Sequence, residues 1–394
     1  MIYMNNTPKS LRPQFFLDPD IVFLNHGSFG ACPKPIFDEY QEWQRKLETR
    51  PVKFQAEEVF THLENSRRAL GEYINCDKDD LVYFPNPTHA VSNLIPSLNL
   101  SERDEVLTTN QEYGACDRAW VYYAEQSGFK YIKSEIPLPI MSVEEFCQWF
   151  WSKATPQTKY VYLSHITSTT ALILPIDKIV KEAKVRGIKT IIDGAHVPGH
   201  IPLDIKAMDP DYYTAACHKW LCCPKGVSFL YVRKELQDGM QPLVFSWGWG
   251  KEYDEFKAST QLHSESRFVN IFQWQGTRDM SAFLTVPASI EFQNQYDWDS
   301  VRSRCGEMVL DARNRITELT GLPQLCPDDW LGQMATILFP MDDTVAFKER
   351  LYDDHQIEIP TMAHEGYTAF RISIQGYNSE ADVDHLILTL KNLI

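Results

Sequence analysis

Short apolar runs rich in β-branched and aromatic residues alternate with helical patterns through the middle of this chain. Six runs have the length and composition of buried strands, at residues 81–84, 105–108, 160–163, 188–192, 212–216 and 227–232. Strands that alternate with helices form a mostly parallel sheet with helices on both faces. The chain is therefore predicted to be an α/β protein with a mostly parallel, doubly wound sheet. The last run, which follows Gly226, is expected to return antiparallel.

Different patterns flank this alternation. Helical patterns cover about 35–50 and 56–74, and a long helical stretch runs from about Ser281 past Tyr296 toward Leu319. Strand patterns near 335–339 and 369–374 then indicate a small α+β unit. The aromatic, weakly periodic segment from about Phe245 to Gln275 is predicted to be an irregular loop at an active site or interface.

A chain of 394 residues is long for a single core, which favours two domains. We predict an N-terminal segment at 1–30, a large domain at 31–290 and a small C-terminal domain at 291–394, to which the N-terminal segment also contributes.

Composition narrows the classes of partner. The formal net charge is −15, without a basic run, which argues against nucleic acid or an anionic membrane surface. No stretch has the apolar length of a membrane span, and the polar N-terminus lacks the apolar core of a signal peptide. Nine scattered cysteines do not form a disulfide framework or a paired metal site. These features predict a cytoplasmic protein that acts on a small molecule and has no metal site.

Asp193 and Lys219 supply the two groups that a pyridoxal-phosphate site requires. Asp193 ends the strand pattern at 188–192, and the carboxyl end of such a strand is where open α/β sheets place their ligands. A carboxylate there can keep a pyridine nitrogen protonated. Lys219 follows the strand pattern at 212–216 beside Trp220, an apolar setting that lowers the pKa of an amine toward Schiff-base chemistry. Each residue also has a structural alternative, since such an Asp is often a helix cap and such a Lys is often solvated.

Other polar residues follow the predicted strands. The turn around Thr88 and His89, between a strand and a helix, can bind a phosphate, although an ordinary capped turn would look the same. Tyr113 can lie over a ring, and the stretch that ends at Ser168 offers donors at the same sheet edge. Arg371 lies in an apolar strand and suits a substrate carboxylate, with an internal salt bridge as the alternative.

These segments together resemble the class V aminotransferase group of fold-type I pyridoxal-phosphate enzymes, and within it the isopenicillin N epimerase-like branch. The similarity spans nearly the whole chain, through Phe23–Gly30, Glu112–Ala115, Cys217–Trp220 and Arg371–Ser373. It implies a large cofactor-binding domain with a seven-stranded sheet and a small C-terminal domain. It also implies that Lys219 carries the cofactor as an internal aldimine and that Asp193 pairs with the ring nitrogen.

The resemblance assigns further roles. It implies that Tyr113 stacks on the ring, that Ser168 lies near the ring hydroxyl and His196 beside the cofactor, and that Arg371 binds the substrate carboxylate. The implied phosphate site consists of Thr88, His89 and His218. A Gly-Thr pair from a neighbouring subunit completes this site in the family, and Gly276 and Thr277 match it, which implies a homodimer. Substrate-binding positions are expected at Asn25 and His26, with substrate choice also set by the loop at 245–250 and by Tyr367.

The reaction is less constrained than the cofactor. An amino-acid substrate would lose its α-proton to Lys219, with Asp193 stabilising the resulting carbanion. Branch similarity favours an epimerase-like or C–S lyase activity on a cysteine-derived or related amino acid, with an aminotransferase as the alternative. The stretch 360–367 contains no cysteine, which disfavours persulfide-forming desulfuration. A non-catalytic α/β metabolite-binding protein is the alternative of a different class.

Overall fold

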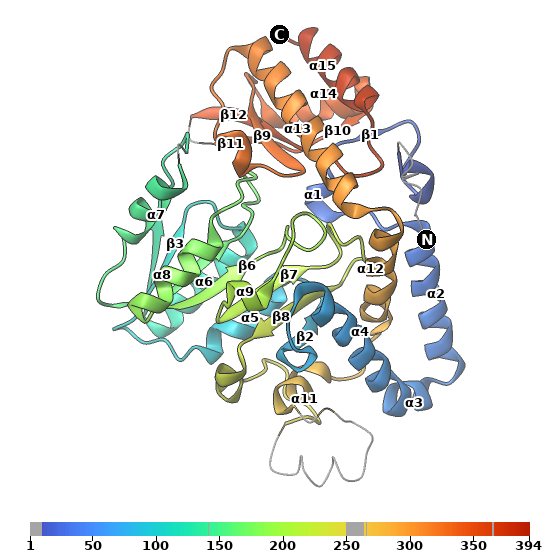
Figure 1. The fold of residues 1–394 in the computed structure, drawn as a ribbon, viewed down its shortest axis with the longest axis vertical. Coiled ribbons are helices and arrows are strands. Elements are labelled where there is room, and N and C mark those ends of the chain that lie inside the picture. The colour runs from blue at the N-terminus through green and yellow to red at the C-terminus, as the bar shows by residue number, and fades with distance from the viewer. Residues whose placement is uncertain (1–9, 141, 250–263, 265, 365) are drawn as a thin grey trace.

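A computed structural model describes residues 10–394 except 141, 250–263, 265 and 365. Its largest element is a seven-stranded sheet in the order β2-β8-β7-β6-β5-β3-β4 (Figure 1). The strands are β2 (Leu81–Phe84), β3 (Glu105–Thr109), β4 (Lys130–Ser134), β5 (Thr158–Ser164), β6 (Lys189–Asp193), β7 (Tyr212–Ala216) and β8 (Ser228–Val232). All neighbouring pairs are parallel except the two that involve β8. The predicted α/β fold and the antiparallel return of the last strand are thus confirmed.

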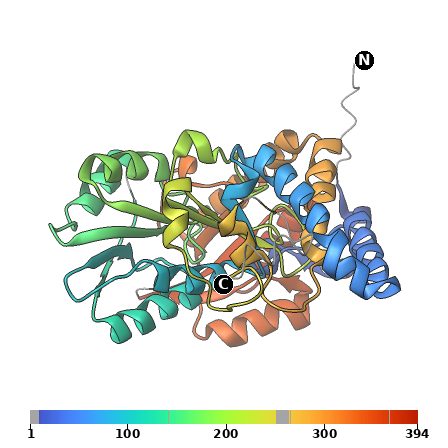
Figure 2. The ribbon, with the colours of Figure 1, turned by 90° about the horizontal axis from the view of Figure 1, so that it is seen from below.

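Helices cover both faces of this sheet, as the view from below shows (Figure 2). Alternate residues of the strands point to opposite faces, so Tyr213 packs in one apolar core with α4, α7 and α8, while Tyr212 packs in another with α5, α6 and α11. The helices of this part are α4 (Val59–Ile74), α5 (Pro87–Ser97), α6 (Gly114–Ser127), α7 (Val143–Trp151), α8 (Ile176–Arg186), α9 (Ile205–Met208), α11 (Arg267–Gln273) and α12 (Val286–Gln295). Burial on both faces explains the continuous apolar runs of the central strands.

The C-terminal part forms a second unit around a three-stranded antiparallel sheet, β11-β12-β9 (Figure 1). Its elements are α13 (Trp298–Thr320), β9 (Met334–Leu338), α14 (Thr344–His355), β10 (Ile357–Glu358), β11 (Thr361–His364), β12 (Tyr367–Ser373) and α15 (Glu380–Lys391). This arrangement confirms the small C-terminal α+β unit. The predicted boundary at residue 290 falls inside α12, and the division into domains stays a prediction.

The N-terminal segment joins the C-terminal unit rather than the large sheet. Strand β1 (Val22–Phe23) pairs in parallel with β10, and Asn25 bridges to Ser373 at the end of β12. A short helix, α1 (His26–Phe29), follows, and then α2 (Lys34–Thr49) and α3 (Pro51–Lys53) lead to α4. Gly30 lies between α1 and α2. Its φ is 71°, and a Cβ there would lie 2.3 Å from the carbonyl oxygen of His218, so only glycine lets this segment pack against the backbone beside Lys219.

Three details differ from the sequence predictions. Strand β4 was not predicted, because its residues lie at the sheet edge and are mostly exposed or half-buried. The segment 245–275, predicted to be irregular, contains helix α11, which Ser266 caps by accepting a hydrogen bond from the Val269 N–H at 3.3 Å. The long helix expected from Ser281 is broken between α12 and α13, where Asp297 adopts φ 46°. Part of the segment 245–275 lies outside the described residues.

Candidate active site

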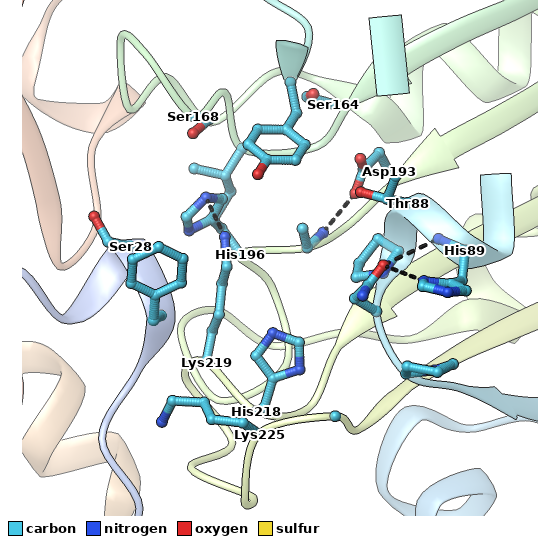
Figure 3. Close-up of a pocket in the computed structure, with 18 residues that line it drawn as sticks. Ser28, Thr88, His89, Ser164, Ser168, Asp193, His196, His218, Lys219 and Lys225 are labelled. Carbon is cyan, nitrogen blue, oxygen red and sulfur yellow. Dashed lines mark hydrogen bonds between the residues drawn. The ribbon is translucent and has the colours of Figure 1, made fainter. Parts of the chain in front are cut away.

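The carboxyl ends of four parallel strands open into one cavity of about 540 Å³ (Figure 3). Asp193 is the last residue of β6, and Ser164 is the last residue of β5. Tyr113 follows β3, and Lys219 follows β7, and all four residues line the cavity. Because the strands are parallel, residues far apart in sequence meet at this edge of the sheet. The sequence-predicted residues Thr88, His89, Ser168, His196 and His218 line the same cavity.

Lys219 extends along the floor of the cavity toward His196 (Figure 3). Its Nζ lies 3.1 Å from Nε2 of His196 and 6.0 Å from the centre of the Tyr113 ring. Burial, and after it the positive charge of Arg371, lowers the pKa of Lys219 to about 7. A substantial fraction of this amine is therefore unprotonated near neutral pH, which is the form that attacks a carbonyl carbon.

Asp193 is fully enclosed and is fixed by several donors. Oδ1 accepts a hydrogen bond from the Ala195 N–H at 2.9 Å, and Oδ2 accepts one from the Tyr162 hydroxyl at 3.3 Å. The Cys116 thiol lies 3.7 Å from Oδ2. Burial raises the pKa of Asp193, whereas these donors and Lys219 oppose that rise. The result is a rigid carboxylate at the cavity wall, suited to a cationic ring nitrogen.

Residues from the start of α5 and His218 also line the cavity, and Thr88 lies beside Asp193 (Figure 3). The Asn86 side chain caps α5 by accepting the His89 N–H at 3.0 Å, and it also lies 3.0 Å from Nδ1 of the His89 ring. His218 donates its Nδ1–H to the Val227 carbonyl at 2.8 Å, so its Nε2 is the nitrogen left for a ligand. Burial lowers the pKa of His218 to about 4. The Thr88 hydroxyl can donate to an anionic phosphate, and Nε2 of His218 can do so once the ring takes up a proton.

Arg371 lies behind the cavity wall, on β12, and is 5% exposed. Its guanidinium donates to the Ser168 backbone carbonyl and, at 3.2 Å, to the Ser28 hydroxyl, while its Nε has no partner within the described part of the chain. No carboxylate among the described residues forms an ion pair with it, and burial lowers the pKa of Arg371 to about 10. A buried cation without an anion is costly, so this site is suited to an anionic ligand.

Some predicted residues lie outside the cavity lining. His26 is buried, with Nδ1 3.0 Å from the Tyr377 hydroxyl and Nε2 3.1 Å from the Lys219 carbonyl oxygen. Asn25 donates to Glu358 at 3.3 Å. Thr277 is exposed and does not line the cavity of its own chain, and neither does Tyr367, which is also exposed. In the loop predicted to select the substrate, residues 245–249 are described and residue 250 is not.

Sequence reasoning missed four residues that shape the site. Ser28, Phe29 and Lys225 line the cavity, and Lys225 donates to the Gly30 carbonyl at 3.0 Å. Glu112 is buried behind Tyr113 and accepts hydrogen bonds from Thr109 and from the Ser164 N–H and hydroxyl, each at 2.7 Å. The signal for Glu112 was present, because a carboxylate directly before Tyr113 at a strand end needs buried donors.

Comparison with known proteins identifies the family. The family model for aminotransferase class-V matches residues 31–386, which is most of the chain. The chain belongs to the class-V aminotransferases. This match confirms the resemblance inferred from the sequence.

Two curated relatives are similar to this chain in sequence, and one solved structure is similar to it in fold. Isopenicillin N epimerase from Amycolatopsis lactamdurans is 30% identical over 388 residues, covering 97% of both chains. A probable chloroplastic L-cysteine desulfhydrase from Arabidopsis thaliana is 28% identical, covering 96% of this chain and 84% of the relative. A structure of C-DES with glycine covalently linked to the pyridoxal-phosphate cofactor has a TM-score of 0.81 at 20% identity, covering 97% of this chain and 99% of the other.

As a class-V enzyme the protein depends on pyridoxal phosphate, and the residues of the cavity fit this cofactor. Lys219 supplies an amine with a lowered pKa, and Asp193 supplies a fixed carboxylate at the other wall. His218 and Thr88 offer phosphate ligands, and the flat face of Tyr113 borders the same space. No helix of the described chain is long and apolar enough to cross a membrane.

Proposed function

We propose that the protein removes the α-proton of a cysteine-derived or related amino acid, and that epimerisation or C–S bond cleavage follows. The observation that carries this proposal is the pair formed by Arg371, a buried cation without an anion among the described residues, and Lys219, an amine whose pKa is lowered by burial and by the charge of Arg371. The relatives named epimerase and desulfhydrase support these two reactions. No cysteine lines the described cavity, which argues against a persulfide-forming cysteine at the site.

Each residue has a distinct role in this proposal. Bound pyridoxal phosphate supplies an aldehyde for the substrate amine and a ring that withdraws the electron pair left at Cα. Arg371 binds the substrate carboxylate, held in place by Ser28 and Ser168. Lys219 Nζ takes the proton from Cα, and Asp193 holds a positive charge at the ring nitrogen. Thr88, His89 and His218 bind the phosphate, and His196 contacts the cofactor.

Spectroscopy tests the cofactor assignment to Lys219. Protein loaded with pyridoxal phosphate should show an absorption band that borohydride removes, and peptide mapping should then find the cofactor fixed on Lys219. Lys225→Ala is the matched control, because Lys225 lines the same cavity. Cofactor fixed on Lys225, or a band that persists unchanged in Lys219→Ala, would refute the role of Lys219.

A product assay distinguishes the reactions. Cysteine, cystine and S-substituted cysteines would be incubated in deuterium oxide with the wild type and with Lys219→Ala. Pyruvate and a thiol or persulfide indicate C–S cleavage, inverted substrate labelled at Cα indicates epimerisation, and a keto acid with amination of the cofactor indicates transamination. Deuterium exchange at Cα in the wild type but not in Lys219→Ala is expected in every case. Exchange at the wild-type rate in the variant would contradict the proposal.

We further propose a homodimer in which Gly276 and Thr277 reach the neighbouring cavity. Arg278 supports this proposal by bracing the loop, since its guanidinium donates to Gln275 at 3.0 Å and to the Gln273 carbonyl at 3.2 Å while Thr277 stays exposed. Two inactive variants, Lys219→Ala and Thr277→Ala, should regain activity when mixed as subunits, because one site of the hybrid is complete. No recovery in a verified hybrid would refute shared sites.

A cytoplasmic location is also part of the proposal. All nine cysteines are unpaired, as expected in a reducing compartment. Fractionation of the native source would test this location.

A further inference from the structure

Trp220, next to Lys219, is enclosed by three histidines. Its indole N–H lies 3.3 Å from Nδ1 of His196. The His200 ring lies against the indole with centres 4.1 Å apart and an interplanar angle of 33°, and the His26 ring lies at 4.8 Å. The Trp220 backbone carbonyl accepts from Gln293 at 3.0 Å. These contacts leave the buried indole a single orientation, with its N–H directed at His196.

The chemistry of the indole decides the protonation of His196. An indole N–H can only donate, so Nδ1 of His196 must be the nitrogen without a proton. His196 is neutral, because burial and then the charge of Lys219 hold its pKa well below the usual range. A neutral imidazole without a proton on Nδ1 carries it on Nε2, the nitrogen 3.1 Å from Lys219 Nζ.

The two flanking histidines have partners other than the indole for their ring nitrogens. Nε2 of His200 accepts the Gln333 backbone N–H at 2.6 Å, so its Nδ1–H donates to the His196 carbonyl at 3.0 Å. Nε2 of His26 lies 3.1 Å from the Lys219 carbonyl oxygen and 3.3 Å from the Gln375 amide nitrogen, and its Nδ1 lies 3.0 Å from the Tyr377 hydroxyl. Neither ring therefore competes with His196 for the indole N–H.

We propose that Trp220 is a positioning residue that holds His196 in the tautomer protonated at Nε2, so that His196 faces Lys219 only as a hydrogen-bond donor. The unprotonated amine of Lys219 accepts this bond through its lone pair. An ammonium at the same place would face an N–H and gain no acceptor from His196. The other charged or titratable groups that act on Lys219 are Arg371, which disfavours the ammonium, and Asp193 and Cys116, which favour it.

The consequence for the reaction rests on the proposed role of Lys219 as the proton acceptor. Because His196 only donates to Lys219, the amine stays unprotonated and can take a proton from the substrate. The same hydrogen bond favours release of that proton from Lys219 afterwards. It also means that His196 can donate to, but never accept from, any group that a ligand presents at this point of the cavity.

Nitrogen NMR of the full chain, labelled with ¹⁵N at histidine, tests the tautomer directly. The spectrum would be recorded with and without cofactor, and His196→Gln would assign the resonances. We expect an unprotonated Nδ1 and a protonated Nε2 at His196 in the wild type. A proton on Nδ1 would overturn the proposal without any variant of Trp220.

Chemical labelling tests the effect on Lys219. The pH dependence of its acetylation would be followed by mass spectrometry in cofactor-free protein, with Lys225 as the internal reference. In Trp220→Phe, His196 is free to accept, and the midpoint for Lys219 should rise by roughly one pH unit, which lowers the free amine at pH 7 by about fivefold. Trp151→Phe is the matched control, because the buried Trp151 N–H has no partner within the described chain. It should leave the midpoint unchanged.

Different results would refute the role of Trp220 and the proposed function of the protein. An unchanged midpoint in folded Trp220→Phe, or an equal shift in Trp151→Phe, would overturn the role of Trp220. Failure to find cofactor on Lys219 after borohydride would instead refute the proposed function, and the tautomer measured by NMR would still stand.

Discussion

Replacing Arg371 by Gln should separate stability from activity, because this guanidinium is buried without an anion. Burial lowers the pKa of Arg371 from its ordinary value to about 10, which corresponds to a cost of roughly 3 kcal/mol for keeping the group charged in the folded protein. The variant loses the donors to Ser168 and Ser28, at about 1 kcal/mol for each hydrogen bond. The two effects nearly cancel, so the free energy of unfolding should change little.

Activity should respond strongly to the same change. A charge-assisted pair between Arg371 and a substrate carboxylate contributes about 3 kcal/mol, so kcat/KM should fall by about 10²-fold. Turnover of an amine that lacks a carboxylate should fall much less. The pH midpoint of any residual activity that depends on Lys219 should rise, because Arg371 lowers the pKa of that amine.

Denaturant unfolding and steady-state kinetics on Arg371→Gln would measure both quantities. Arg315→Gln is the control, because Arg315 on α13 forms exposed ion pairs with Asp311 on the same helix and with Asp384 on α15. A large loss of stability in Arg371→Gln with unchanged kcat/KM would refute the reasoning and make Arg371 a structural residue.

Three further predictions concern buried titratable groups. Asp193→Asn should lower turnover by about 10²–10³-fold while cofactor stays bound, as absorbance and activity would show, and wild-type turnover would exclude its role. Burial lowers the pKa of His218 to about 4, so the ring is neutral before the cofactor binds, and the bound phosphate should add a proton to it. Calorimetry in buffers of different ionisation enthalpy should detect this proton uptake, and His218→Gln should abolish it. Burial raises the pKa of Glu112 from 4.5 to about 7, so the folded protein holds this proton at pH values where the unfolded chain has lost it. As pH rises from 4.5 to about 7, the wild type should therefore lose stability relative to Glu112→Gln, and above pH 7 the difference should stay constant. Equal pH profiles of the two proteins in thermal melts would contradict this.

The sequence predicted the fold where burial leaves a simple pattern. Central strands such as β5 and β6 are covered on both faces, so their apolar runs stand out. The edge strand β4 has no such run, because solvent reaches its residues. The break at Asp297 depends on a single left-handed residue between two helical stretches, which periodicity does not reveal.

The site was predictable to the extent that its residues follow strands. Asp193, Tyr113 and Lys219 each come after a strand, and a parallel sheet brings such positions to one edge. Trp220 could not be identified in this way, because its role depends on the orientation of three imidazoles from distant segments. His26 was expected to contact substrate; its two ring nitrogens have partners on Tyr377 and on the backbone of Lys219, and its role stays a prediction.

The pairing of β1 with β10 sets the order in which parts of this enzyme can fold. Val22 of β1 pairs with Ile357 of β10, although 335 positions separate them in the sequence. Gly30, soon after β1, packs against the backbone at Lys219. During synthesis β1 must therefore wait until β10 has been made before it can dock. Nascent chains that end before β10 should build the large sheet yet leave Lys219 uncovered on one side, and competence for catalysis should appear only after β10 has been made.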